Sequence, residues 1–433
     1  MISVFSMICH GKGEKSKMKF FIIFVVSVLV LFNEADPAGA WSYPGSGNMI
    51  AEVSNQALPG DPVGSVDART LGMGGAGIAV SEGVTGLMYN PANIANQSRA
   101  LMLGLNSNIV EETGGDEEFY SSAHYFRMPV WGMIYPVGPV NLGVGQRRDL
   151  DMDYFHEHKV FEDGVADTYK ADISGGINRT MLTTGFRVFG NMYTGVTFNL
   201  LGGGVEGDSN QKIVGDSKTD HEIERDFSGN YIELGVLYRL FRDQAAIGLN
   251  FAPSYTIEDD WEQVTEKEIW DDTGDGVWVE DSKTKLKDKR DVDMPSKIGL
   301  GIRYNFLSLD QTLITAEIER VSWSDFRYQD SNGDKVNPGY RDTTSLRVGA
   351  EHYVNFTTAL RAGFSYQPFY SSSAVDRVSF NLGTGIDVSP DISINIGGKM
   401  GMSTYQGDNP FSEEDKRVTE RQIELMTGMV WNF

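Results

Sequence analysis

The chain has 433 residues, and its 60 Asp and Glu outnumber its 37 Lys and Arg, for a formal net charge of −23 at pH 7. Nucleic-acid binding relies on lysine and arginine side chains that neutralise phosphates, so this balance argues against a nucleic-acid partner. After residue 40 there is neither a cysteine nor an apolar stretch of about eighteen residues. The sequence therefore excludes disulfides, thiolate metal sites and membrane-spanning helices from that part of the chain.

Residues 1–40 are predicted to be a signal peptide with an upstream extension. Lysines precede an apolar run from Phe20 to Phe32, and Ala38-Gly39-Ala40 has the A-x-A form of a signal-peptidase site. The run is about thirteen residues long, shorter than the roughly twenty that a membrane-spanning helix needs. We therefore expect the mature chain to begin at Trp41 and to be exported.

The stretch from Arg69 to Ser98 is rich in glycine, which suits a backbone that passes close to other backbone. The glycines are Gly72, Gly74, Gly75, Gly77, Gly83 and Gly86. Proline restricts the preceding residue to extended geometry, so Asn90-Pro91-Ala92 predicts a rigid turn. Three of the glycines also match the G-x-G-x-x-G spacing of a dinucleotide site. No apolar strand precedes them and no strand–helix alternation follows, which disfavours nucleotide binding.

From Arg99 onward, apolar residues alternate with glycine, asparagine and charged residues. The clearest case is the run of Ile298, Leu300, Ile302, Tyr304 and Phe306. In a soluble sandwich this face would meet a second sheet, whereas in a barrel it meets lipid. Short turns (136–139, 189–191, 241–244, 307–310, 354–357, 388–391) alternate with long polar connections (110–118, 150–172, 203–228, 255–295, 324–342, 367–376, 403–417). This alternation predicts an all-β fold, a closed antiparallel outer-membrane barrel of about 14 strands over residues 99–433.

The last predicted strand places aromatic and aliphatic residues on one face: Ile423, Leu425, Met429, Trp431 and the terminal Phe433. Such an ending resembles the signal that the barrel-assembly machinery recognises, which would make that machinery a partner during biogenesis. An amphipathic final strand is also compatible with other sheet proteins.

The glycine-rich stretch resembles the N-terminal hatch of the FadL-type outer-membrane transporters, the OmpP1/FadL/TodX-like barrels. The matching residues are Ala68-Arg69, Leu71 to Ala76, Ala79-Val80, Leu87 and Tyr89 to Ala92. Weaker matches downstream are Met294-Pro295, Trp323 to Phe326 and Leu360 to Tyr366. The resemblance implies a barrel of fourteen strands in the bacterial outer membrane, in contact with its lipid, with residues 41–98 as a hatch (plug) inside.

The same resemblance implies passive uptake of hydrophobic small molecules, either long-chain fatty acids or aromatic hydrocarbons, with a sideways exit through the wall. The hatch and gating residues would be Asn90, Pro91, Ala92, Gly74 and Gly75. Apolar residues of the predicted loops would line the ligand path: Trp261, Trp270, Trp278 and Phe326. The alternative is a structural or adaptor barrel of a secretion or conjugation system. A continuous apolar cavity between the loops and the hatch would distinguish the transporter from the adaptor.

Alternation places charged side chains on the predicted lumen face: Glu233, Arg239, Arg303, Arg347, Glu351, Arg361 and Asp387. Paired or hydrated, they would rigidify the barrel. The alternative is that the arginines act as weak counter-ions for a passing carboxylate.

Nothing in the sequence predicts an enzyme or a cofactor. Five histidines follow the signal region, at positions 124, 156, 158, 221 and 352, and no spacing suggests a serine and a histidine that converge on one outer face as in a barrel lipase. His156 and His158 beside Glu157 could clamp a metal, but a solvated charged loop is the favoured explanation. Asp271, Thr273 and Asp275 resemble the first half of a calcium loop, and residues 330–334 repeat the theme. Neither has a glutamate at the twelfth position, so an acidic loop tip is the alternative to calcium.

Overall fold

The structure is a computed structural model that describes residues 42–43, 60–80, 83–114, 120–162, 165–271, 277–306, 311–330, 332–371, 376–409 and 412–433. The predicted signal peptide and most of residues 41–59 lie outside these ranges. No helix in the described ranges is long and apolar enough to cross a membrane.

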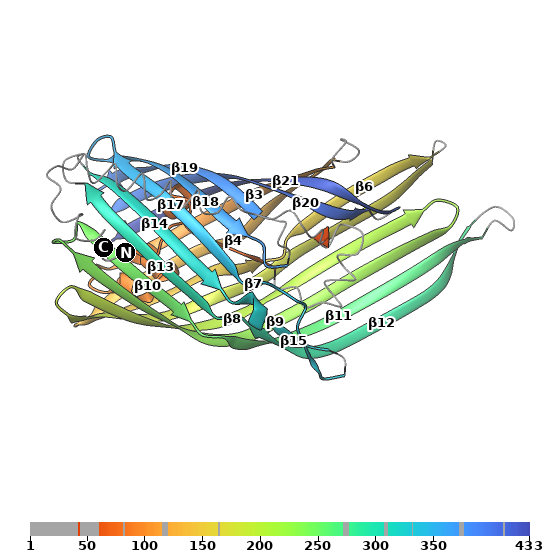
Figure 1. The fold of residues 1–433 in the computed structure, drawn as a ribbon, viewed down its shortest axis with the longest axis horizontal. Coiled ribbons are helices and arrows are strands. Elements are labelled where there is room, and N and C mark those ends of the chain that lie inside the picture. Colours follow the sequence, from red (N-terminus) through yellow and green to blue (C-terminus); the bar gives the residue numbers. More distant parts are fainter. Residues whose placement is uncertain are drawn as a thin grey trace, which may run out of the picture. The chain divides into compact units, whose positions relative to one another are not determined.

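Fourteen antiparallel strands close into a barrel, which confirms the predicted fold class (Figure 1). In chain order they are β3 (Ala100–Gly114), β4 (Tyr120–Val137), β5 with β6 (Val140–Asp151 and Tyr154–Glu162), β7 (Val165–Phe189), β8 (Met192–Ile213), β9 (Ser217–Leu240), β10 with β11 (Ala245–Ala252 and Tyr255–Asp271), β12 with β13 (Val277–Met294 and Lys297–Phe306), β14 (Thr312–Val321), β17 (Thr343–Tyr353), β18 (Thr358–Pro368), β19 (Asp376–Ser389), β20 (Ile392–Asn409) and β21 (Ser412–Asn432). The ladder between β21 and β3, in which Trp431 lies opposite Leu101, closes the ring.

The two faces of the wall differ as the alternation predicts. Leu234 and Leu300 point outward and are 45% and 44% exposed, whereas Glu233 and Arg303, which point inward, are 4% and 5% exposed. Successive side chains of a strand point to opposite faces. A shift of the strand register by one residue would therefore turn the charged side chains towards the outer face. An apolar outer face with a polar interior is the pattern of a barrel that meets lipid.

Several connections that the sequence predicts as long loops are strands. The region 203–228 is the β8–β9 hairpin and 255–295 is the β11–β12 hairpin, with the strands paired along almost their whole length. Regions 150–172 and 403–417 are likewise mostly strand. Beyond the apolar band these strands carry polar residues on their outer face. The prediction of loops from that polarity was therefore wrong. We call β6, β11, β12 and the parts of β7, β8 and β9 beyond the apolar band the extension.

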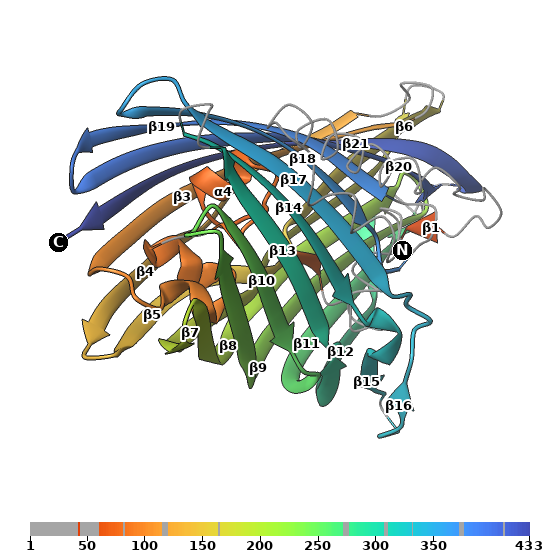
Figure 2. The same cartoon turned by 60° about the vertical axis from the view of Figure 1, so that its left-hand side comes forward.

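Residues 60–98, here called the inner segment, pack against the inner face of the wall (Figure 2). The inner segment contains β2 (Asp61–Pro62), α4 (Ala68–Gly72), η1 (Gly83–Met88) and η2 (Pro91–Ile94). Asp67 caps α4 by accepting hydrogen bonds from the backbone N–H groups of Arg69 and Thr70. Asn90 caps η2 in the same way, with Pro91 at the first position, where its missing N–H costs nothing. The two caps fix the residues at which these short helices begin.

Wall glycines allow the inner segment to touch the barrel backbone. A Cβ atom at Gly363 would lie 2.1 Å from the backbone nitrogen of Gly74, and one at Gly235 would lie 2.0 Å from Oδ1 of Asn90. Similar close approaches occur at Gly185, Gly195, Gly248, Gly349, Gly383 and Gly397. Gly74 itself has φ +72°, a conformation that disfavours other residues. The wall is therefore shaped to fit the inner segment, with no room for a methyl group at these points.

Three short strands and a 3-10 helix complete the described elements. β1 (Ser42–Tyr43) pairs in parallel with β20. After β14, η3 (Trp323–Asp325) leads into the small hairpin of β15 (Arg327–Gln329) and β16 (Lys335–Val336). β15 also pairs with the base of β12, so this excursion is tied to the extension.

Candidate functional site: a cavity between the inner segment and the wall

A cavity of about 100 Å³ lies between the inner segment and the wall. Val63, Ile78 and Tyr89 line it from the inner segment, and strands from β5 to β17 supply the other walls. Its charged lining comprises Arg147, Asp149, Arg179, Glu233, Lys297, Glu317, Glu319 and Arg347. These are four cations and four carboxylates, so the charges of the lining balance.

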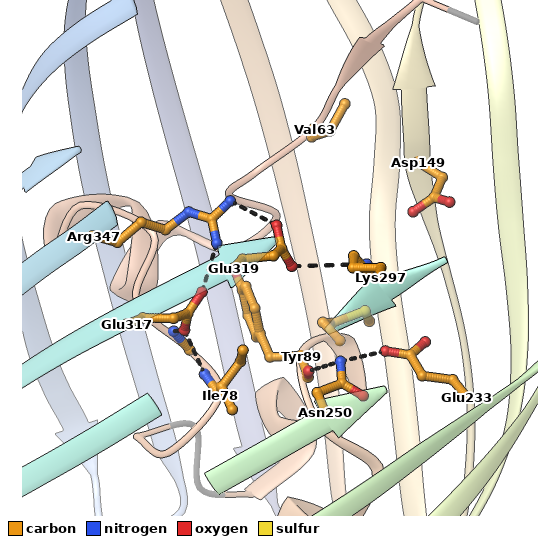
Figure 3. Close-up of polar contacts among 12 residues, drawn as sticks. Val63, Ile78, Tyr89, Asp149, Glu233, Asn250, Lys297, Glu317, Glu319 and Arg347 are labelled. Carbon is orange, nitrogen blue, oxygen red and sulfur yellow. Dashed lines mark hydrogen bonds and ion pairs between the residues drawn. The ribbon is translucent and has the colours of Figure 1, made fainter. Parts of the chain in front are cut away.

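Glu317 joins the wall to the inner segment on one side of the cavity (Figure 3). One of its carboxylate oxygens accepts hydrogen bonds from the backbone N–H groups of Gly77 (2.8 Å) and Ile78 (2.9 Å). The other accepts from Arg347 at 2.6 Å, and Arg347 also bonds Glu319 at 3.1 Å. A buried carboxylate that accepts from this many donors fixes the turn at Gly77.

A second polar group holds the opposite side. Arg179 forms an ion pair with Glu233 at 2.8 Å. The amide nitrogen of Asn250 donates to Glu233 (2.6 Å) and to the backbone carbonyl of Tyr89 (2.8 Å) (Figure 3). Arg147 donates to the carbonyl of Met88 at 3.0 Å. Both wall and inner segment thus contribute to each polar cluster around the cavity.

Aromatic rings also line the cavity, and the Tyr231 hydroxyl accepts a hydrogen bond from Arg179. Tyr231 and Tyr255 stack with their ring centres 4.2 Å apart, and both line the cavity together with Trp323. Trp323 in turn stacks on Tyr370 at 4.3 Å. The same buried cluster includes Phe326, Tyr340 and Phe369. We call Trp323, Phe326, Tyr340, Phe369 and Tyr370 the aromatic cluster.

The wall is interrupted beside the cavity. The ladder between β4 and β5 ends where Trp131 lies opposite Gln146. Further along, that edge of β5 pairs with β2 of the inner segment instead, with Pro62 opposite Leu150. The inner segment therefore replaces a wall strand at this point, and moving β2 would uncover an unpaired edge.

The predicted gating residues lie at the contacts between the inner segment and the wall. Asn90 is fully buried, and its amide nitrogen donates to the carbonyls of Ile78 (3.1 Å) and Val236 (3.2 Å). Gly74 packs on β17 and β18, and at Gly75 (φ +84°) a Cβ would meet the Ser65 hydroxyl. Pro91 and Ala92 lie against the glycines of β8 and β9.

The four predicted ligand-lining residues do not come together. Trp261 in β11 is buried on the inner side of the extension, where Arg290 lies over its ring. Trp270 and Trp278 face each other across the tip of the β11–β12 hairpin with ring centres 5.1 Å apart. Phe326 belongs to the aromatic cluster. Sequence reasoning missed Tyr231, Tyr255 and Trp323, of which only Trp323 carried a signal, within the Trp323–Phe326 motif.

The predicted lumen charges occupy different levels of the interior. Glu233 and Arg347 line the cavity. Glu351 binds Arg69 of the inner segment (2.7 Å) and Arg361 of β18 (2.7 Å). Near the end of the barrel with the short turns, Arg303 and Arg239 both pair with Asp243, and the Asp387 carboxylate accepts from Ser393. Every one of them has an ion-pair or hydrogen-bond partner.

Two contacts between a hydroxyl group and a histidine occur on the outer face of the described wall. Ser107 and His124 do converge on the outer face, with 2.6 Å between the hydroxyl oxygen and Nε2. Thr312 makes a comparable contact with His352 at 2.8 Å. Both are diagonal or direct cross-strand contacts of outward-facing residues, which are common in antiparallel sheets. We therefore interpret them as sheet contacts and assign them no chemistry.

The candidate metal ligands give no assembled site. Thr273 and Asp275 lie outside the described residues, and so do the side chains of His156 and His158, which belong to β6 and not to a loop. Asp330 accepts hydrogen bonds from the backbone N–H groups of Asn332 and Asp334, both at 2.9 Å, and closes the β15–β16 turn. Within the described ranges, no group of three or more His, Cys, Asp or Glu is placed to hold a metal ion.

Known structures share the fold of this chain. The toluene transporter TodX of Pseudomonas putida matches with a TM-score of 0.64 at 18% identity, over 87% of this chain and 100% of that one. A FadL homologue of Pseudomonas aeruginosa matches with a TM-score of 0.63 at 14% identity, over 86% and 100%. The toluene transporter TbuX of Ralstonia pickettii gives 0.59 at 18% identity, over 86% and 99%. The fold is therefore FadL-like.

Sequence comparison adds the family. No curated protein matches the sequence. The model of the family described as BamG matches residues 60–410, which include the inner segment and most of the barrel. A match over this much of the chain shows that the protein belongs to the BamG family.

Proposed function

We propose that this protein is an outer-membrane channel that admits small hydrophobic compounds by diffusion and that the inner segment is the hatch that keeps it closed. The observation that carries this proposal is the break between β4 and β5, which β2 fills beside the cavity. The transport roles of the structurally similar TodX and TbuX support it as analogy. A lipid-facing barrel needs no such removable strand for its stability.

The path leads from the aromatic cluster into the cavity and then sideways between β4 and β5. A straight path would have to displace the whole inner segment, which the wall glycines and the Glu317 and Glu351 contacts hold in place. Moving β2 alone breaks far fewer contacts and opens towards the membrane.

The cavity favours single-ring compounds over long acyl chains. An engineered cavity of about 150 Å³ binds benzene, and pockets for larger organic ligands measure roughly 300–1,000 Å³. The cavity here is about 100 Å³ in this conformation. A long-chain fatty acid would have to open the aromatic cluster as well, whereas a small aromatic hydrocarbon needs only a slight expansion.

A reversible cross-link tests the gate. Pro62 and Leu150 are paired residues of β2 and β5, and the chain has no cysteine after residue 40. Replacing both with cysteine should give a disulfide that stops uptake of labelled toluene by cells, and reduction should restore it. The matched control is the pair Thr183 and Thr197, which joins β7 to β8 away from the break.

Two results of these uptake measurements would contradict the proposal. Toluene uptake that depends on the protein but ignores the Pro62–Leu150 disulfide would reject the sideways gate. Uptake that is unchanged when the gene is deleted and restored, for toluene and for a labelled long-chain fatty acid, would reject the channel itself.

The second candidate is a structural or adaptor barrel, and the extension favours it. Between Val277 and Asp291, no strand in the described part of the chain pairs with the edge of β12 that faces away from β11. At its tip, Trp270 is 36% exposed beside Trp278. Exposed edges and tryptophans are typical of protein contacts. A double change of Trp270→Ala and Trp278→Ala should release a bound partner protein if the adaptor role is correct and leave toluene uptake unchanged.

A further inference from the structure

Three buried polar atoms at the cavity have no hydrogen-bond partner within the described structure: Oδ1 of Asn250, Nε of Arg147 and Nε of Arg179. Nε of Arg179 lies 3.6 Å from the Asp149 carboxylate in an ion pair, which leaves Oδ1 of Asn250 and Nε of Arg147. Asn250 is 5% exposed and Arg147 is 6% exposed. Leaving a buried polar atom unpaired costs roughly 1–3 kcal/mol, so such atoms usually meet a water or a ligand.

The orientation of the Asn250 amide follows from its neighbours. Its nitrogen donates to a carboxylate oxygen of Glu233 and to the backbone carbonyl of Tyr89, which are both acceptors. A rotated amide would place Oδ1 against two acceptors, so the observed orientation is the only one consistent with them. The free group at the cavity is therefore an acceptor, and Arg147 contributes a donor.

The charges of the lining restrict the ligand to a neutral molecule. Four cations and four carboxylates line the cavity. Arg347, Arg179 and Lys297 form ion pairs with carboxylates of the same lining. A carboxylate ligand would add a negative charge that nothing offsets in a buried site. A hydroxyl group can accept from a guanidinium N–H and donate to an amide oxygen without adding charge.

The aromatic part of the lining suits a flat ring, and the Tyr231 hydroxyl within it accepts a hydrogen bond from Arg179. The stacked pair of Tyr231 and Tyr255 and the indole of Trp323 provide apolar and aromatic surface there. Aromatic rings pack well against such surfaces in offset or edge-on arrangements. A ligand with a ring at one end and one neutral polar group at the other would contact both parts of the lining.

We propose that the cavity is a binding site for a neutral single-ring aromatic alcohol of the phenol class, with the hydroxyl at Asn250 and Arg147 and the ring against Tyr231, Tyr255 and Trp323. The proposal rests on the proposed function in treating this cavity as part of the transport path, and it narrows the cargo from hydrocarbons in general to hydroxylated ones. Water would satisfy the same polar atoms and is the competing occupant.

Phenol and toluene are suitable probes because they differ by a hydroxyl against a methyl group. We would measure binding of each radiolabelled compound to the purified full chain in detergent by equilibrium dialysis. Phenol should bind saturably and at least about tenfold more tightly than toluene, because toluene leaves both polar atoms unpaired. Benzoate should not bind at pH 7.

Two variants and one control locate the site. Ala252→Leu places a larger side chain in the cavity, opposite Lys297 of β13, and it should abolish saturable phenol binding. Asn250→Leu should weaken phenol binding at least about tenfold and lower the ratio of phenol affinity to toluene affinity. Phe251→Leu, on the adjacent outward-facing residue, should leave both unchanged. Circular dichroism and thermal unfolding confirm that each variant is folded.

The outcomes separate this inference from the proposed function. If neither compound binds saturably, the cavity holds water only and the inference is wrong. Toluene that binds as tightly as phenol, or phenol binding that survives Ala252→Leu, also overturns it. In these cases toluene uptake that the Pro62–Leu150 cross-link still blocks would leave the channel function intact.

Discussion

The hydroxyl group of Tyr370 donates a hydrogen bond of 3.1 Å to the backbone carbonyl of Gly60, the residue that precedes β2. Tyr370 stacks on Trp323, which lines the cavity, and Gly60 leads into the strand that fills the break in the wall. The aromatic cluster above the cavity is thus bonded directly to the start of the sealing strand. A molecule that displaces Tyr370 would loosen that strand.

We predict that Tyr370→Phe increases the rate of toluene uptake by cells or proteoliposomes. The ring remains stacked, but the bond to Gly60 is lost, which costs about 0.5–1.5 kcal/mol of the closed state and shifts the equilibrium of β2 by up to about tenfold. Tyr366→Phe is the matched control, since it removes a hydroxyl bond of 2.7 Å to Asp376 that does not involve the inner segment. Equal uptake by both variants would argue against the coupling.

We predict that Gly235→Ala destabilises the protein by about 1–3 kcal/mol, because its methyl group would overlap Asn90. Gly202→Ala is the control, since a Cβ there meets only the Phe227 carbonyl at 3.9 Å. The measurement is the free energy of unfolding in urea for folded protein in detergent. If Gly235→Ala lost no more stability than Gly202→Ala, the inner segment would not pack closely against β9 in solution.

We predict that Glu317→Ala destabilises the protein by about 3–5 kcal/mol, since it breaks a buried ion pair and leaves Arg347 and two N–H groups without that acceptor. Arg320→Ala on the same strand breaks the exposed pair with Asp342 and should cost less than about 1 kcal/mol. Urea unfolding gives both values. The Glu317 variant should also expose residues 77–78 to hydrogen exchange, and protection equal to wild type would contradict its anchoring role.

The turn at Asp330 should weaken in acid. The backbone N–H groups of Asp334 and Asn332 hold the pKa of the Asp330 carboxyl below its usual range. A depressed pKa in the folded state means that the contribution to stability is present above about pH 4 and is lost as the pH falls through the folded pKa. Carboxyl ¹³C NMR titration should show this shift. The β15–β16 turn of Asp330→Ala should show no such pH dependence, and an ordinary pKa in the wild type would contradict the turn geometry.

The barrel could be predicted from the sequence because the alternation of side chains within one strand and the short turns between strands are local features. The alternation at residues 298–306 separates the outer face from the lumen without reference to any other strand, and the short turns mark where strands reverse. The same logic failed in the extension, where the outer face of β9 and β11 is polar near Asp226 and Asp260. Polarity there records solvent on the outer face and gives no sign that the backbone is paired.

The glycine-rich run from Gly72 to Gly86 and the Asn90-Pro91 turn indicated by themselves that a compact, capped segment precedes the barrel, since glycine and proline restrict backbone geometry locally. The cavity depended on the tertiary structure. Arg147, Glu233 and Trp323 are far apart in the sequence, and only the closure of the ring and the path of the inner segment bring them to one space. Unpaired atoms such as Oδ1 of Asn250 exist only once every neighbouring partner has been placed, and no pattern along the chain records them.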